Sequence, residues 1–421
     1  MTPYNPSQSY AQTCDAEDPL ASFRDRFHIP TDFLYFVGHS LGLQPRNVRP
    51  YVEQELSDWE TLAVEGHFKA QNPWMPYHEF LTENLATVVG ALPIEVVAMN
   101  TLTVNLHLMM VSFYRPTPKR YKIVIEGTAF PSDQYAVASQ AAYHGFDPEN
   151  GVIPLRPREG ENIIRTEDIE ALLEREGESI ALIMLGGVNY LTGQAFDMAR
   201  ITEMGHRHGC TVGFDLAHAA GNLVLRLHDW DVDFAVWCSY KYMNGGPGCV
   251  GGAFVHERHA HSTDLPRFAG WWGHDKETRF KMPSGFVPIP GVEGWQLSNP
   301  PILPLAALRA SLEIFVEAGM DRLREKSEAL TGYLEYLLKI KLDEYITIIT
   351  PEDPKQRGAQ LSIRVKRNGA AVYEQLSQAG VLCDWREPDV IRVAPIPLYS
   401  TFSDVYRFVE LFAKANRALE A

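Results

Sequence analysis

The sequence has little cysteine and no block of lysine or arginine. Its five cysteines are scattered over 421 residues without a C-x-x-C pair, which is typical of reduced thiols in a cytoplasmic protein and not of a disulfide framework. The formal net charge is −15, whereas proteins that bind nucleic-acid phosphates carry a basic stripe. The composition therefore excludes a disulfide scaffold and disfavours a nucleic-acid partner.

Long apolar runs are missing as well. The longest stretches, such as LHLMMVSFY, are far too short to span a bilayer. The first twenty residues are polar and show neither the basic nor the apolar region of a signal peptide. What remains is an ordinary globular composition, 45% hydrophobic and 22% charged, of a length typical of two domains. We expect a cytoplasmic protein without a membrane segment.

A regular alternation of strands and helices begins near residue 94. Short apolar runs rich in β-branched residues are separated by turns and helical stretches, which predicts parallel strands buried on both faces. Such a doubly wound α/β sheet binds ligands at the carboxyl ends of its strands. The predicted strands are EVVAMN (95–100), YKIVIEG (121–127), IALIMLGGV (180–188), CTVGFD (210–215), DFAVWCS (233–239) and VGGAFVH (250–256).

The pattern changes around residue 300. A segment with proline at its start and leucines at helical spacing predicts a connecting helix, followed by a second amphipathic helix. Four further apolar runs, ITIIT, QLSIRVK, VLCDW and VIRVAPI, indicate a small α+β unit. We predict an N-terminal arm over 1–55, a large α/β domain over 56–300 and a small domain over 301–421.

Two charged residues follow predicted strands 26 residues apart. Asp215 ends the strand CTVGFD, and Lys241 follows the strand DFAVWCS. A carboxylate at such a buried position needs a cation. An arginine would serve, and so would the protonated nitrogen of a pyridine ring. One helix and one strand fit between the two residues, so they could face each other across a shared pocket, with His218 near Asp215.

Two other strand ends carry helix-start signals. After EVVAMN, Thr101 or Thr103 can cap a new helix, whose first turn is either an ordinary start or a cradle for phosphate. After YKIVIEG, the run Phe130, Pro131, Ser132 and Asp133 lies at a strand-to-helix turn. Spacing alone does not decide between ordinary helix starts and a ligand site at either position.

The letters G-x-G-x-x-G occur at Gly246, Gly248 and Gly251, but they do not indicate a dinucleotide fold. Such a fingerprint should follow a strand and open a helix, with an acid about twenty residues later. Here Pro247 lies inside the pattern and CVGGAFVH after it reads as strand. The glycines are better explained by close passage of the backbone past a ligand.

The cluster HERHAH offers His256, His259 and His261, but the spacing is not that of a zinc motif. We interpret it as a surface loop and expect no metal site. Cys238 and Cys249 lack an obvious base and are expected to be buried structural thiols.

Taken in order, several segments resemble the kynureninase family, fold-type-I pyridoxal-phosphate enzymes of the aspartate aminotransferase superfamily. The resemblance covers nearly the whole chain, from FVGHSLGLQP to the last helix. It implies a large doubly wound domain with a small C-terminal α+β domain. The segments that carry it are LTVNLH, AFPSD, GFDLAHAAGN, WCSYKYMNGGPG, GWWGH, SNPP and IRVAPIPLY.

The resemblance also implies roles for matching residues. Lys241 would bind the aldehyde of pyridoxal 5′-phosphate, Asp215 would hold the pyridinium nitrogen and Tyr240 would be the acid near the cleaved bond. The cofactor-binding positions that it implies are Leu102, Thr103, Phe130 (stacked on the ring), Pro131, Ser132, Asp133, Asp215, His218, Tyr240, Lys241, Trp271 and Asn299. The implied substrate-binding positions are His67, Ser298, Asn299 and Arg392, the arginine for the α-carboxylate.

The implied reaction is hydrolytic Cβ–Cγ cleavage of L-kynurenine or its 3-hydroxy form to L-alanine and an anthranilate, a step of tryptophan degradation and NAD biosynthesis. Trp271 and Asn299 match residues that relatives contribute from the other subunit, which implies a homodimer. His67, Ser298 and Asn299 match relatives that prefer 3-hydroxykynurenine. Gly186 departs from the serine of some relatives, which leaves one cofactor contact in doubt.

Two alternatives stay open. A cysteine desulfurase or selenocysteine lyase on the same scaffold would need a mobile catalytic cysteine, for which Cys383 is the candidate, although VLCDWRE reads as strand. A non-catalytic regulator that binds pyridoxal phosphate would have lost site residues, yet the positions other than Gly186 match the family.

Overall fold

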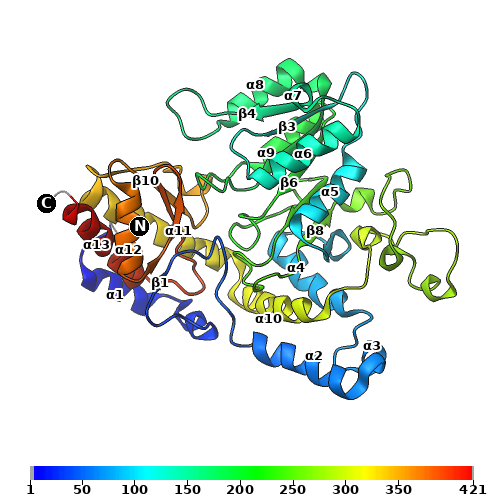
Figure 1. The fold of residues 1–421 in the computed structure, drawn as a ribbon, viewed down its shortest axis with the longest axis horizontal. Coiled ribbons are helices and arrows are strands. Elements are labelled where there is room, and N and C mark those ends of the chain that lie inside the picture. Colours follow the sequence, from blue (N-terminus) through cyan, green and yellow to red (C-terminus); the bar gives the residue numbers. More distant parts are fainter. Residues whose placement is uncertain (1–3, 420–421) are drawn as a thin grey trace.

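The computed structural model describes residues 4–419, and its centre is a seven-stranded sheet (Figure 1). The strand order is β2-β8-β7-β6-β5-β3-β4, and β8 pairs antiparallel with both of its neighbours while the other pairs are parallel. The strands are β2 (Val96–Ala98), β3 (Lys122–Glu126), β4 (Val152–Leu155), β5 (Ile180–Gly186), β6 (Thr211–Asp215), β7 (Phe234–Trp237) and β8 (Gly252–Val255).

All six strands predicted for this region are present, and two features differ from expectation. The sequence did not indicate β4, a four-residue edge strand that contains Pro154, a residue that weakens a strand prediction. The reversed direction of β8 was also not foreseen, because an apolar run buried on both faces reads the same in either direction.

Helices cover both faces of the sheet, as a doubly wound fold requires. Alternate residues of β5 belong to different cores: Ile183 packs with α8, α9 and α10, whereas Leu182 packs with α5 and α6. The helices of this part are α4 (Thr82–Val89), α5 (Leu102–Phe113), α6 (Pro131–Tyr143), α7 (Pro148–Gly151), α8 (Thr166–Glu176), α9 (Met198–Arg207) and α10 (Ile302–Ala318).

The C-terminal part is a four-stranded antiparallel sheet in the order β12-β13-β10-β9, covered by helices. Its strands are β9 (Ile346–Ile348), β10 (Leu361–Val365), β12 (Asp384–Arg386) and β13 (Val390–Val393), with α11 (Met320–Leu342), α12 (Gly369–Gln378) and α13 (Phe402–Ala418). Strands β9, β10 and β13 fall within predicted apolar runs, whereas β12 only overlaps the predicted run VLCDW and ends one residue beyond it. The domain boundaries at 55 and 300 stay a prediction.

The beginning of the chain packs on its end. Helix α1 (Gln8–Glu17) lies against α13, and β1 (Leu34–Tyr35) pairs in parallel with β11 (Val381–Leu382), as Figure 1 shows at the left. Helix α2 (Val48–Leu62) then crosses to α10, and α3 (Gly66–Lys69) follows it. Among residues 4–419, none of the helices combines the length and apolarity that a membrane span needs.

Candidate functional site

A cavity of about 100 Å³ lies at the carboxyl ends of the central strands. It is lined by Glu126, Gly186 and Asp215, the last residues of β3, β5 and β6, and by the segment after β7. The structure thus brings together, around one space, residues predicted from four separate segments. These are Leu102, Thr103, Phe130, Ser132, Asp133, Asp215, His218, Tyr240 and Lys241.

Lys241 projects into this cavity beside a histidine. Its Nζ lies 3.1 Å from His218 Nε2 and 5.9 Å from the centroid of the Phe130 ring. Burial, and next the charge of Lys241, lower the pKa of His218 well below its usual value, so this imidazole is neutral and accepts a hydrogen bond from the amine. The pairing holds the amine in the cavity.

Three buried carboxyl groups lie at the same edge. Burial raises the pKa of Asp215, and it raises that of Glu126 to about 7. Burial and then the neighbouring Asp215 raise the pKa of Asp133. Asp215 accepts a hydrogen bond of 2.7 Å from the backbone N–H of Ala217, which fixes its orientation. Groups in this state are stabilised by a cation that enters the cavity.

The first turns of α5 and α6 form the other side of the cavity. Thr103 Oγ1 and Ser132 Oγ lie 2.8 Å apart, one from each helix. Thr101 is the residue before α5, as predicted, but its side chain makes no capping bond. A Cβ on Gly251 would lie 3.2 Å from the backbone nitrogen of Leu102. The approach to this first turn is therefore open, and its N–H groups and the helix dipole suit an anion.

Pyridoxal 5′-phosphate, the cofactor that the resemblance implies, fits these residues. Its aldehyde would meet the amine of Lys241, its pyridine nitrogen the carboxyl of Asp215 and its phosphate the start of α5. Buried polar atoms support this fit, since Asp133 Oδ1 and His218 Nδ1 have no hydrogen-bond partner among the described residues. Unsatisfied atoms at such a place are explained by a polar ligand.

The glycine-rich segment does not open a helix, as predicted, whereas its close passage past a ligand stays a prediction. Gly246 and Gly248 have φ values of +90° and +71°, which side chains rarely adopt. The chain then enters β8, a strand and not a helix, so the dinucleotide interpretation fails.

Six predicted residues do not line the cavity of this chain. His67 lies in α3 with its ring 5.4 Å from that of Trp74. Trp271 is 40% exposed and donates through Nε1 to the carbonyl of Arg279 at 3.2 Å. Ser298 and Asn299 are exposed. Pro131, also predicted, is the first residue of α6 and does not itself line the cavity.

Arg392, on β13, is also outside the cavity and is 1% exposed. Its Nη2 pairs with Asp384 Oδ2, and its Nη1 donates to the carbonyl of Tyr190 at 2.6 Å. Burial lowers its pKa to about 10, which leaves the guanidinium charged at neutral pH. Tyr190 itself lines the cavity, so the arginine lies directly behind its wall.

Sequence reasoning missed Glu126, which accepts hydrogen bonds from the N–H of Gly186 at 2.5 Å and from Asn189 Nδ2 at 2.6 Å. A Cβ at position 186 would lie 2.8 Å from Glu126 Oε1, which accounts for glycine there in this chain. The signal was available, because Glu126 ends its strand as Asp215 does.

The histidine cluster after β8 is only in part a surface loop. His261 is exposed, but His256 is buried, and its Nε2 lies 3.3 Å from the carbonyl of His228. The prediction was wrong for His256, because its segment folds back onto the edge of the sheet. Cys238 and Cys249 are buried, as expected, although Cys238 also lines the cavity.

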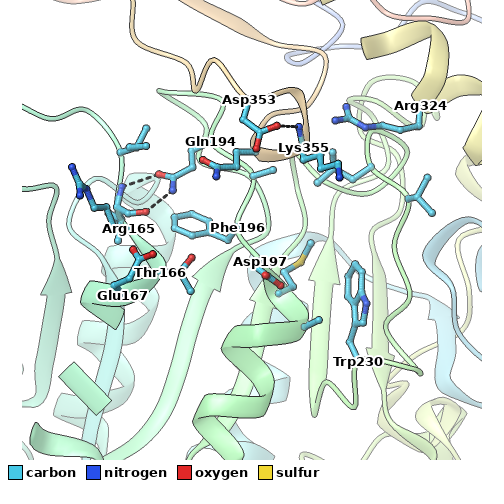
Figure 2. Close-up of a pocket in the computed structure, with 18 of the residues that line it drawn as sticks. Arg165, Thr166, Glu167, Gln194, Phe196, Asp197, Trp230, Arg324, Asp353 and Lys355 are labelled. Carbon is cyan, nitrogen blue, oxygen red and sulfur yellow. Dashed lines mark hydrogen bonds between the residues drawn. The ribbon is translucent and has the colours of Figure 1, made fainter. Parts of the chain in front are cut away.

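A larger cavity, of about 540 Å³, lies elsewhere, between the central sheet and the C-terminal part (Figure 2). Its polar groups are engaged with the backbone: Gln194 bonds to both backbone groups of Ile164, and Asp353 accepts from the N–H of Lys355. No predicted site residue lines it. The chemistry therefore concentrates in the smaller cavity.

Comparison with known proteins identifies the family. A model of the kynureninase C-terminal domain matches residues 323–412. Kynureninase of Koribacter versatilis is 64% identical over 97% of this chain and 98% of its own length. This chain belongs to the kynureninase family. The kynureninase of Myxococcus xanthus, 61% identical over 97% of this chain and 98% of its own, agrees. The resemblance recognised in the sequence is confirmed.

Solved structures show the fold. The apo structure of a cysteine desulfurase from Thermococcus onnurineus has a TM-score of 0.79 at 15% identity and covers 94% of this chain and 98% of its own. A cysteine desulfurase from Escherichia coli gives 0.77 at 18% identity, with 95% and 98% covered. The predicted fold, type I of the pyridoxal-phosphate enzymes, is confirmed.

Proposed function

We propose that this protein is an enzyme that cleaves the Cβ–Cγ bond of L-3-hydroxykynurenine, and of L-kynurenine, with water. The products are 3-hydroxyanthranilate or anthranilate and L-alanine, as in tryptophan degradation and NAD biosynthesis. The observation that carries the proposal is the shared cavity of Lys241 and Asp215 in a chain 64% identical to a kynureninase. The enzyme acts on its substrate through pyridoxal 5′-phosphate bound at that cavity.

Pyridoxal phosphate, when bound, supplies an electron sink for the charge that develops on the substrate carbons. Asp215 would hold the ring nitrogen in its charged form, and Phe130 would pack on the ring face. Thr103 and Ser132, whose hydroxyls lie 2.8 Å apart at two helix starts, would bind the phosphate together with Leu102. Asp133 and His218 would complete the pocket lining, and Pro131 would contribute only by starting α6.

Lys241 and Tyr240 move the protons. Lys241 Nζ takes the proton from the substrate Cα and returns it, and the neutral His218 at 3.1 Å keeps this amine in place. Burial raises the pKa of the Tyr240 hydroxyl above its ordinary value of 10. Tyr240 therefore stays protonated and serves as the acid at the cleaved carbon.

Substrate recognition involves both parts of the chain and a second subunit. Arg392 binds the α-carboxylate, and His67, Ser298 and Asn299 select the 3-hydroxy ring. We propose a homodimer in which Trp271 and Asn299 complete the partner's site. Three apolar side chains around α2 and α3 support such an interface, since Trp59, Val64 and Phe68 are 62%, 71% and 65% exposed.

The proposed dimer belongs in the cytoplasm, since all five cysteines are free and four of them are buried. The burial of these cysteines also argues against the cysteine desulfurase alternative. Cys383 is buried, and burial raises the pKa of its thiol to about 12, the opposite of an activated cysteine.

The test is turnover of each kynurenine by the holoenzyme, followed by anthranilate fluorescence. We expect turnover of both substrates and a visible absorption band that borohydride abolishes. When the borohydride is labelled, the label should be found on Lys241. A protein that binds the cofactor but turns over neither substrate would be a regulator. A protein that cannot be reconstituted with pyridoxal phosphate would refute the proposal.

Substrate preference is tested by comparing wild type with His67→Trp on both kynurenines. We expect the wild type to favour 3-hydroxykynurenine and the variant to lose that preference. An unchanged ratio of kcat/KM values would remove His67 from the selective set.

A further inference from the structure

A buried histidine outside the predicted set lies between the two halves of the proposed site. His39 is 1% exposed, and neither of its ring nitrogens has a hydrogen-bond partner within residues 4–419. Its ring centroid is 6.4 Å from that of His218, the neighbour of Lys241. A buried polar ring without partners is costly, so it calls for an explanation.

Three nitrogen groups converge on one oxygen near this ring. Asp384 Oδ2 pairs with Arg392 Nη2, lies 3.1 Å from Arg386 Nη2 and lies 3.5 Å from His39 Nε2. The two arginines come from the C-terminal sheet, whereas His39 comes from the N-terminal arm. Asp384 is thus the point at which the arm meets the arginine proposed to bind the substrate carboxylate.

The backbone that carries His39 is fixed on both sides. On one side, the N–H of Ala394 donates to the carbonyl of Phe36 at 2.9 Å, close to Arg392 in sequence. On the other, the N–H of Gly42 donates to the carbonyl of Tyr240 at 2.8 Å, directly before Lys241. A Cβ on Gly42 would lie 2.5 Å from the Lys241 carbonyl oxygen, so the contact is close. The ring has little freedom to turn away.

We propose that His39 is a positioning residue of the carboxylate site: its Nε2, 3.5 Å from Asp384 Oδ2, donates to that carboxylate when substrate binds and so holds the guanidinium of Arg392 in place. The inference rests on the proposed function, in which Arg392 receives the α-carboxylate. When that carboxylate binds Arg392, the ion pair between the guanidinium and Asp384 weakens. His39 then donates a hydrogen bond to the same Asp384 oxygen.

The charges around the ring agree with a neutral donor. Burial, followed by Arg392 and Lys241, lowers the pKa of His39 well below its ordinary value of 6.5. A neutral imidazole carries one N–H, and the nitrogen that faces the carboxylate is the one that keeps it. A neutral His39 avoids placing a third positive charge beside Arg392 and Lys241.

The experiment compares two amines that differ in one group. L-alanine and ethylamine are titrated into the holoenzyme, and binding is followed by the change in visible absorption. Both react through the amine, but only L-alanine needs Arg392. In His39→Leu we expect roughly tenfold weaker binding of L-alanine, the size of a lost bond to a charged group, and unchanged binding of ethylamine. With kynurenine the KM rises by the same factor while kcat changes less than about twofold.

Conservative variants locate the contact on the ring. The amide of His39→Gln reaches about as far as Nε2 and should restore L-alanine binding to within roughly threefold of wild type, whereas the shorter His39→Asn should not. This pair also serves if the leucine variant folds poorly. The matched control is His256→Leu, a buried histidine 3.4 Å from Asp231 beyond the end of β8, which should not alter the ratio.

The outcomes are distinct. Equal loss of both amines in His39→Leu, or no loss of either, overturns the role of His39 while leaving the proposed function intact. Equal binding by the glutamine and asparagine variants overturns it as well. A wild-type holoenzyme that responds to neither amine would refute the proposed function, and the role of His39 with it.

Discussion

Two edges of the central sheet carry buried histidines and carboxylates, and they differ in how these groups are satisfied. At the edge where the parallel strands begin, Asp233 accepts from His206 Nε2 and His259 Nε2 at 2.9 Å each and from the N–H of Val212 at 2.8 Å. At the opposite edge, Asp133 and His218 retain atoms without partners among the described residues.

The pKa values follow this difference. Burial acts to raise the pKa of Asp233, but hydrogen bonds from His206 and His259 outweigh it, and the pKa falls below its ordinary value. For Glu126, burial outweighs the bonds from Asn189 and Gly186, and the pKa rises to about 7. A satisfied buried charge stabilises the fold, whereas an unsatisfied one marks a place where a ligand is expected.

The sharpest test of this contrast is Lys241→Ala. Turnover should fall by at least about a thousandfold, because the proposed function makes this amine both the point of cofactor attachment and the base. The urea midpoint of the apo protein should change little. If the variant lost stability while its folded fraction stayed active, Lys241 would have a structural role, and the assignment of the ligand site to this edge would be wrong.

The complementary change is Asp233→Asn. It removes a charge that two histidines and Arg258 surround, so we expect a loss of about 3 kcal/mol in the free energy of unfolding. The loss is complete above about pH 4 and begins to shrink below it, because the unfolded wild-type chain then takes up a proton near the ordinary pKa of 3.8 while the folded carboxylate keeps its charge. Urea unfolding at pH 7 and pH 3.5 measures this. A change in kcat of the folded enzyme would contradict a purely structural role.

Glu126→Gln should have a smaller effect, of opposite sign in its pH dependence. The folded-state pKa of about 7 lies above the ordinary 4.5, so the apo protein loses stability as the pH rises from 4.5 through 7, and about 2 kcal/mol of this loss falls between pH 5.5 and pH 8. The variant should lack this loss when urea midpoints at pH 5.5 and pH 8 are compared. The control, Glu95→Gln, should lower stability at both pH values because Glu95 accepts three hydrogen bonds at the satisfied edge.

The smallest effect is expected for Cys383→Ser. Cleavage of kynurenine should stay within about twofold of wild type, with a stability cost of about 1 kcal/mol for a hydroxyl in an apolar cluster. Kinetics and a melting curve are sufficient. Release of sulfide from L-cysteine by wild type, abolished in this variant, would support the desulfurase instead.

Strand ends could be predicted because the physics that creates them is local. Continuous apolar runs located the sheet, and Asp215 is the last residue of β6 while Lys241 lies four residues beyond the end of β7. The same reasoning would have identified Glu126, had it been recognised as the last residue of the strand predicted from YKIVIEG. The direction of β8 is set by pairing partners and leaves no mark on its own residues.

Contacts between segments that are distant in the sequence could not be predicted. His39 and Asp384 are 345 positions apart, and neither lies in a pattern that announces chemistry. His256 was read as exposed because its sequence is polar, whereas Glu95 and Asp231 lie beside it from other segments. Burial of a polar residue depends on partners that only the fold supplies.

The packing of α1 on α13 has a consequence for biosynthesis. Helix α1 leaves the ribosome before α13, on which it packs, and β1 leaves before β11, with which it pairs. The segment that carries His39 therefore cannot dock fully until these later elements have been made. A nascent chain that stops before β11 would lack the contact between Phe36 and Ala394, close to Arg392.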